Sequence, residues 1–163
     1  DDFTDIKSVI FTPKICSRPL IDNSNPLSQH FLFITEIKKT KNKYLMTTNI
    51  IGSLDFNEDG YLWVLFEDGT KKKCSVEIYG EIIDFAGKSV SGYTHNIVDF
   101  YIDEEFIEEL ARGNQIKKIR YMTHSGYVDY IHTGFKSERK EDKRKKKEIV
   151  FYSMILDYIS KNN

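Results

Sequence analysis

The chain has 163 residues, 40% hydrophobic and 30% charged, a balance typical of one globular domain spanning residues 1–163 and not of a disordered protein. The formal net charge is −1, so no whole-protein field attracts nucleic acid or an anionic membrane. No apolar run approaches the ~18 residues that a membrane-spanning helix needs, so no transmembrane segment is predicted.

The first half of the chain is dominated by strand patterns. Phenylalanine and tyrosine number 11 and 10, and aromatic residues favour sheets over helices. A loop rich in proline, asparagine and serine is predicted at Ser17–Gln29, and a mobile stretch at Asp84–Thr94. The strands expected in this half are Ile6–Cys16, His30–Ile37, Lys43–Ile50, Tyr61–Phe66 and Lys73–Ile83.

The strand at Tyr61–Phe66 and the turn after it have distinctive patterns. Tyr61–Phe66 (YLWVLF) is apolar at every position, which is typical of a central strand covered on both faces. The Asp-Gly pair within Glu67–Thr70 predicts a tight hairpin to the next strand, in which Gly80 is expected to mark a bulge.

The stretch 95–132 forms the centre of the predicted fold. A strand at Ile97–Ile102 leads to Asp103, an N-cap, and then to a helix at about 104–112 that ends before Gly113. A helix this short needs tertiary packing, so its apolar face must rest on the sheet. The next strand should turn Ile119 and Tyr121 to one side and Lys118 and Arg120 to the other, and a turn at Gly126 should return the chain through Tyr127–His132.

The C-terminal segment combines a charged run with an amphipathic pattern. Ile149, Tyr152, Leu156 and Ile159 share one helical face, which favours a closing helix at about 140–160, solvated in its first half and packed in its second. A late strand over Ile149–Leu156 is the alternative, because most of its residues are β-branched, aromatic or large and apolar.

Parts of the sequence resemble a recurring pattern in small exported domains of Gram-negative gut-type bacteria, which are often predicted lipoproteins with no assigned activity. The resemblance is carried by FYIDEEFIEEL and IKKIRYMTHSGYVDY, together with DDFTD at the start and YLWVLFEDGTKKK before the centre. It covers about two thirds of the chain and contains no functional residues. It implies a periplasmic or cell-surface location, without excluding a cytoplasmic one.

The first residue is Asp1, without an initiator methionine. A removed export leader is one explanation, and excision from a longer chain is the other. The resemblance favours export and leaves open a lipid anchor upstream of residue 1.

One acidic segment resembles part of a calcium site. Asp55, Asn57 and Asp59 place oxygen atoms at alternate positions before Gly60, as in the first half of a calcium loop. The twelfth position, which should hold a bidentate glutamate, is Phe66, so we favour an acidic turn and assign no metal-binding residue.

The two cysteines and four histidines allow several interpretations. Cys16 and Cys74 are either a disulfide or two buried small hydrophobes. The histidines form no paired motif, although they could converge in the fold; they are His30, His95, His124 and His132.

A basic run, Lys143–Lys147 (KRKKK), lies within Lys136–Glu148, which holds eight basic and four acidic residues. It would be a patch for nucleic acid or anionic lipid in a basic protein, but a solvated helix face is the simpler interpretation. No aromatic residue interleaves with the run, so nucleic acid is not an expected partner.

The sequence therefore predicts an α+β fold: a twisted, mainly antiparallel sheet of six to eight strands, sandwich- or half-barrel-like, with one short helix and one C-terminal helix. No catalytic signature is found, and no catalytic residue, cofactor-binding residue or cofactor is assigned. The leading hypothesis is a non-catalytic, exported binding or envelope-associated module that recognises an unidentified ligand or envelope protein through Ser17–Gln29 and Asp84–Thr94. A small hydrolase or metal-dependent enzyme with converging histidines, and a basic-patch binder of nucleic acid or anionic lipid, are the alternatives.

Overall fold

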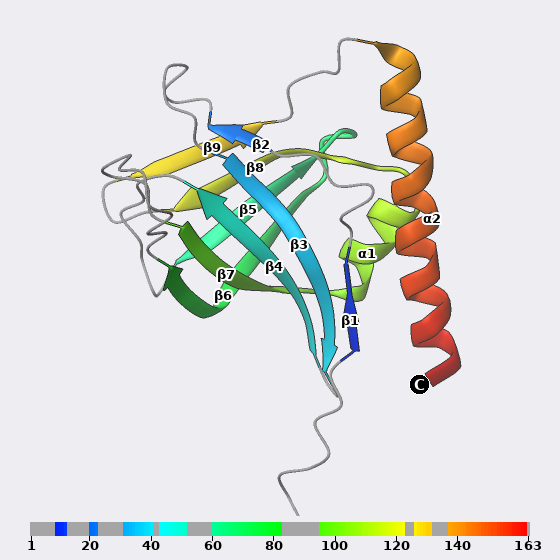
Figure 1. Ribbon diagram of the computed structural model, residues 1–163, viewed down its shortest axis with the longest axis horizontal. Coiled ribbons are helices and arrows are strands. Elements are labelled where there is room, and N and C mark those ends of the chain that lie inside the picture. Colours follow the sequence, from blue (N-terminus) through cyan, green and yellow to red (C-terminus); the bar gives the residue numbers. More distant parts are fainter. Residues whose placement is uncertain are drawn as a thin grey trace, which may run out of the picture.

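The computed structural model describes residues 9–12, 20–22, 31–40, 43–51, 60–82, 95–122, 126–131 and 137–162. Within these ranges the chain forms one antiparallel sheet of nine strands and two helices, which confirms the α+β class (Figure 1). The strands are β1 (Val9–Phe11), β2 (Leu20–Asp22), β3 (Phe31–Thr40), β4 (Lys43–Ile51), β5 (Tyr61–Phe66), β6 (Lys71–Ile82), β7 (His95–Ile102), β8 (Ile116–Met122) and β9 (Tyr127–Ile131); the helices are α1 (Glu104–Ala111) and α2 (Glu138–Asn162).

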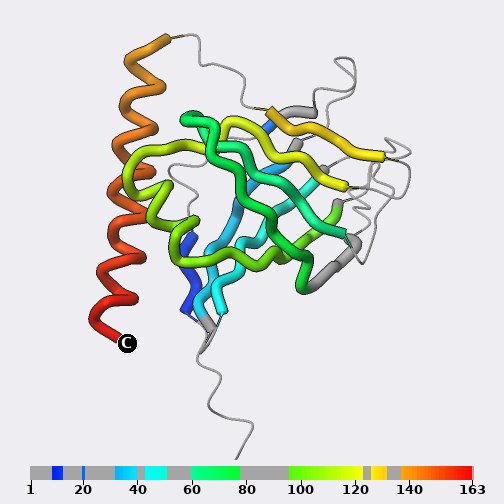
Figure 2. The backbone as a smooth tube through the Cα atoms, turned by 180° about the vertical axis from the view of Figure 1, so that it is seen from behind, coloured from blue at the N-terminus to red at the C-terminus, as the bar shows by residue number. Residues whose placement is uncertain are grey.

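The strand pairings form a closed circuit. Three hairpins, β3–β4, β5–β6 and β8–β9, are joined through β7, which lies between β4 and β6, and through the pairing of β5 with β8. β2 then pairs with both β9 and β3, so the sheet is rolled and has an inner and an outer face (Figure 2). β1 adds to the far end of β3.

The inner face forms the core because apolar side chains recur at every second position. In β5, Leu62, Val64 and Phe66 are fully buried, whereas the alternate residues are half-buried or exposed. The prediction that this strand is covered on both faces is therefore wrong. Its outward side chains are partly or largely accessible to solvent.

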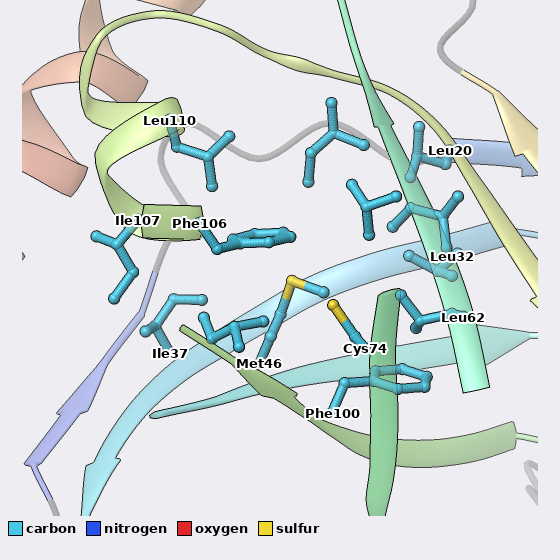
Figure 3. Packing of buried hydrophobic residues seen from close by; sticks show 14 of the residues in the cluster. Leu20, Leu32, Ile37, Met46, Leu62, Cys74, Phe100, Phe106, Ile107 and Leu110 are labelled. Carbon is cyan, nitrogen blue, oxygen red and sulfur yellow. The ribbon is translucent and has the colours of Figure 1, made fainter. Parts of the chain in front are cut away.

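Helix α1 closes one end of the rolled sheet. Asp103 caps it by accepting a hydrogen bond from the Phe106 backbone N–H at 2.8 Å, as predicted. The buried face of the helix, with Phe106, Ile107 and Leu110, points between the strands (Figure 3). Phe106 contacts Phe66 edge to face at a centroid distance of 5.2 Å. An eight-residue helix depends on such packing, since it would not persist alone.

Helix α2 packs on α1 at the outside of the molecule (Figure 1). Tyr152, Ile155 and Ile159 are buried, so the helical interpretation of this segment is confirmed and the strand alternative is wrong. Arg144 is also buried, although the first half of the helix was expected to be solvated. It is held by Glu148 at 2.5 Å, by Glu141 at 2.8 Å and by the side-chain oxygen of Gln115 at 3.1 Å.

Four further expectations differ from the structure or fall partly or wholly outside the described residues. Ser17–Gln29 is not wholly loop, because Leu20–Asp22 forms a strand between β3 and β9. The register shift in β6 falls between Val76 and Ile78 and not at Gly80. Of the opening strand Ile6–Cys16 only Val9–Phe11 is described as a strand, and Asp84–Thr94 lies outside the described ranges.

Gly113 follows α1, has a φ of +86° and lies against α2. A Cβ atom there would lie 2.9 Å from the Ile149 Cδ1 atom of α2. Gly69, in the β5–β6 turn, has a φ of +94° but nothing within 4 Å of its Cβ position. Substitutions at the two glycines therefore distinguish the cost of backbone strain, which both share, from the cost of disturbing the packing of α2, which only Gly113 has.

We expect Gly69→Ala to lower the free energy of unfolding by about 1 kcal/mol, from positive-φ strain alone. Gly113→Ala should cost roughly 1 kcal/mol more, because it also displaces Ile149. Urea unfolding of both variants measures the difference, and Ile149→Val combined with Gly113→Ala should recover part of it. Equal losses for the two glycines would contradict this account of α2 packing.

Candidate binding face

The outer side of β5, β6, β8 and β9 carries aromatic and cationic side chains together. β5 lies between β6 and β8, so Trp63 and Leu65, two outward residues of β5, each have a cross-strand neighbour on both sides. Trp63 lies opposite Lys73 and Arg120, and Leu65 lies opposite Lys71 and Lys118. Each of the two apolar residues is thus flanked by two cations. We call this surface the aromatic–cationic face; it consists of Tyr61, Trp63, Leu65, Lys71, Lys73, Lys118, Arg120, Tyr127 and Asp129.

The rings and cations of this face contact one another. The Lys73 Nζ atom lies 4.0 Å from the centroid of the Tyr61 ring, and the Arg120 guanidinium carbon lies 3.9 Å from that of Tyr127. Such cation–π contacts position the charges without neutralising them. Trp63 is 39% exposed and Tyr127 is 56% exposed, a large solvent contact for aromatic side chains.

Asp129 is the one carboxylate of the face. It accepts hydrogen bonds from Arg120 Nε at 2.7 Å and Nη2 at 2.9 Å, and from Lys118 Nζ at 3.2 Å. The hydrogen bonds from Arg120, followed by the one from Lys118, hold the pKa of Asp129 below its ordinary value of 3.8. Asp129 is therefore ionised at neutral pH and fixes the two cations beside the groove.

A groove of about 390 Å³ opens on this face, within the size range of small-molecule sites. Trp63 and Leu65 supply its apolar surface, and Lys71, Lys118 and Arg120 supply its charge; the Val64 segment also lines it. Among the described residues that line it there is no carboxylate, histidine, cysteine or hydroxyl. The groove can therefore hold an anion against an apolar surface.

The charges on this face are unbalanced. Lys71, Lys73, Lys118 and Arg120 stand against Asp129, four positive charges to one negative. The intervening Lys72 is engaged elsewhere, since it binds Asp103 at 3.2 Å and also pairs with Glu105 at the start of α1. These contacts, chiefly the hydrogen bond to Glu105, raise the pKa of Lys72. Like charges on adjacent strands are unfavourable for folding, so their clustering favours an anionic ligand.

Several candidate residues from the sequence lie outside the described residues. These are Cys16, the acidic group Asp55, Asn57 and Asp59, and three of the histidines, His30, His124 and His132; His95 belongs to β7, but its side chain is not described. Within the described part of the chain no group of histidine, cysteine and carboxylate side chains could hold a metal ion.

Cys74 is a buried, unbridged thiol in the core. Burial raises its pKa to about 12, with a further contribution from the charge of Asp103. Of the two interpretations of the cysteines, the structure thus supports the buried hydrophobe for Cys74. A thiol so protonated is a poor nucleophile.

The aromatic–cationic face was missed in the sequence because its residues come from separate segments. One signal was present: in YLWVLF followed by KKK, alternation places Tyr61, Trp63 and Leu65 on one side of β5 and Lys71 and Lys73 on the same side of β6. Only the pairing of β5 with β8 adds Lys118 and Arg120.

Comparisons of the chain with models of protein families, with curated proteins and with solved structures find no match. Neither helix in the described part of the chain has the length and apolar character needed to cross a bilayer.

Because its pKa is lowered in the fold, Asp129 contributes stability that is complete above its unfolded pKa near 3.8 and is lost as pH falls through its folded value. We expect Arg120→Gln to raise the pKa of Asp129, as measured by NMR titration of its carboxyl carbon. The matched control Lys117→Gln, an exposed lysine on the same strand, should leave it unchanged. An unaltered pKa in Arg120→Gln would contradict the assigned ion pair.

Proposed function

We propose that this protein is a non-catalytic binding module of the cell envelope whose aromatic–cationic face holds an anionic ligand. The observation that carries the proposal is the flanking of Trp63 and Leu65 by cations on both neighbouring strands. The imbalance of charge on this face is unfavourable for folding, since the four cations repel one another and Asp129 compensates only part of their charge.

The groove also defines the shape of its ligand. Trp63 offers an exposed flat ring, and Leu65 continues the apolar surface between Lys71 and Lys118. A matching ligand has a planar apolar body that stacks on the indole and an acidic group that reaches the lysines. Stacking and charge act together, because a partly desolvated anion gains more from each cation than one in open water does.

Binding accounts for this site better than catalysis does. Hydrolysis of a bound anion most often uses a carboxylate, an imidazole, a thiol or a hydroxyl group within reach of the ligand. Among the described residues that line the groove none carries such a group, and its lysine and arginine side chains are suited to holding the anion by charge. A rigid sheet face with fixed cations is suited to recognition.

The proposal can be tested with 1-anilinonaphthalene-8-sulfonate, an anion with a flat naphthalene ring. Trp63 is the only tryptophan, so quenching of its fluorescence reports occupancy of the groove directly. Lys71→Gln combined with Lys118→Gln should weaken probe binding about tenfold, since each removes one partly exposed charge contact. Higher salt should weaken binding to the unsubstituted protein as well.

The matched control is Lys72→Gln combined with Lys117→Gln, which removes two lysines from the same strands without touching the groove. It should bind the probe as the unsubstituted protein does. The proposal fails if both pairs of substitutions have the same effect, or if tryptophan quenching is absent while the probe still binds.

Export is the second part of the proposal, supported by the resemblance to small exported domains. We expect the full reading frame to encode an apolar leader before Asp1. Expression of that frame in a Gram-negative host, followed by cell fractionation, should place the protein in the periplasm or the membrane fraction. Recovery in the cytoplasm with the N-terminus unprocessed would overturn this part alone and leave ligand binding to the groove untouched.

A further inference from the structure

The side chains of the basic run Lys143–Lys147 point in different directions, because the helical twist turns some toward the protein and others toward solvent. Arg144 turns inward and is buried among Gln115, Glu141 and Glu148, and Lys145 lies 3.7 Å from Glu67 at the tip of the β5–β6 hairpin. The other three lysines of the run are turned outward and differ in environment from these two. They are Lys143, Lys146 and Lys147, and all three are exposed.

These lysines belong to a stripe along the whole helix. Spacings of three and four residues place exposed side chains on one line of an α-helix, on the side away from the buried Tyr152, Ile155 and Ile159. We call this line the outer stripe; it consists of Arg139, Lys143, Lys146, Lys147, Val150, Met154, Asp157 and Lys161, all of them exposed.

The composition of the outer stripe is unusual for a face that is merely solvated. It has five basic residues and a single acidic one, Asp157, near its end. Lysines three or four residues apart, such as Lys143 and Lys147, destabilise a helix by repulsion. Two apolar side chains interrupt the charges: Val150 is 70% exposed and Met154 is 51% exposed. Neither the repulsion nor this apolar exposure helps the fold.

We propose that the outer stripe of α2 docks on an anionic membrane surface. The helix has 25 residues, about 37 Å at 1.5 Å per residue, so its cations are spread along a line instead of converging on one group. A lipid surface offers many headgroup charges over that length, and Val150 and Met154, between the lysines, reach the boundary of the acyl chains. This site is separate from the groove and uses none of its residues.

A lipid surface fits the stripe better than a nucleic acid does. Single-stranded nucleic acid is bound by aromatic rings interleaved with the cations, and the stripe has none. A duplex would contact the lysines through phosphates but would leave the two apolar side chains without a partner. The combination of charge with central apolar residues selects the membrane.

The test is co-sedimentation of the full chain with vesicles of phosphatidylcholine alone or with 30% phosphatidylglycerol. We expect binding only to the anionic vesicles, weakening with salt. Each lysine near such a surface contributes about fivefold in affinity, so the triple variant Lys143→Gln, Lys146→Gln, Lys147→Gln should lose about a hundredfold. Val150→Ser with Met154→Ser should also weaken binding while leaving the charge unchanged.

The matched control removes three lysines from the other surface: Lys71→Gln, Lys73→Gln, Lys118→Gln. It has the same net charge as the α2 triple variant and should still bind the vesicles. All variants change exposed or half-exposed positions, and circular dichroism checks that each is folded. Equal loss in the two triple variants would overturn the proposal, because net charge and not the stripe would then drive binding. Binding to neutral vesicles, or tighter binding to a duplex oligonucleotide than to vesicles, would overturn it too.

Discussion

The fold depends on the burial of one short helix in the end of a rolled sheet. Phe106, Ile107 and Leu110 fill the space between the strands at that end, and Asp103 starts the helix at the point where β7 leaves the sheet. The same helix carries the chain across to β8, on the far side of the β5–β6 hairpin. Its packing therefore decides which strand lies beside β5, and with it the composition of the outer face.

The binding face follows from that placement. β8 brings Lys118 and Arg120 to one side of β5, while the hairpin partner β6 brings Lys71 and Lys73 to the other. Asp129 then fixes two of these cations, and Trp63 remains in contact with solvent. The inner face of the same strands is mainly apolar, so one alternating pattern supplies both the core and the charged surface.

The two sides of α2 also differ in role: one packs against the protein and the other faces solvent. Its inward side packs on α1, and the buried Arg144 is compensated by Glu141, Glu148 and Gln115, as a buried guanidinium requires. Its outward side keeps charges and two apolar residues that no described part of the chain covers. The molecule thus presents two separate cationic surfaces despite a net charge of −1, which shows why total charge is a poor guide to local fields.

Local patterns along the chain were enough to predict the capped helix after Asp103 and the hairpins at Gly69 and Gly126, and they favoured the closing helix over a late strand. These depend on turn chemistry and on residues close together along the chain. Tertiary packing sets what covers each face: YLWVLF predicts a strand buried on both faces, yet Trp63 is exposed to solvent. It also decided which strands meet, and therefore that Arg120 lies beside Trp63. Pairings across dozens of residues arise from packing that no local pattern encodes.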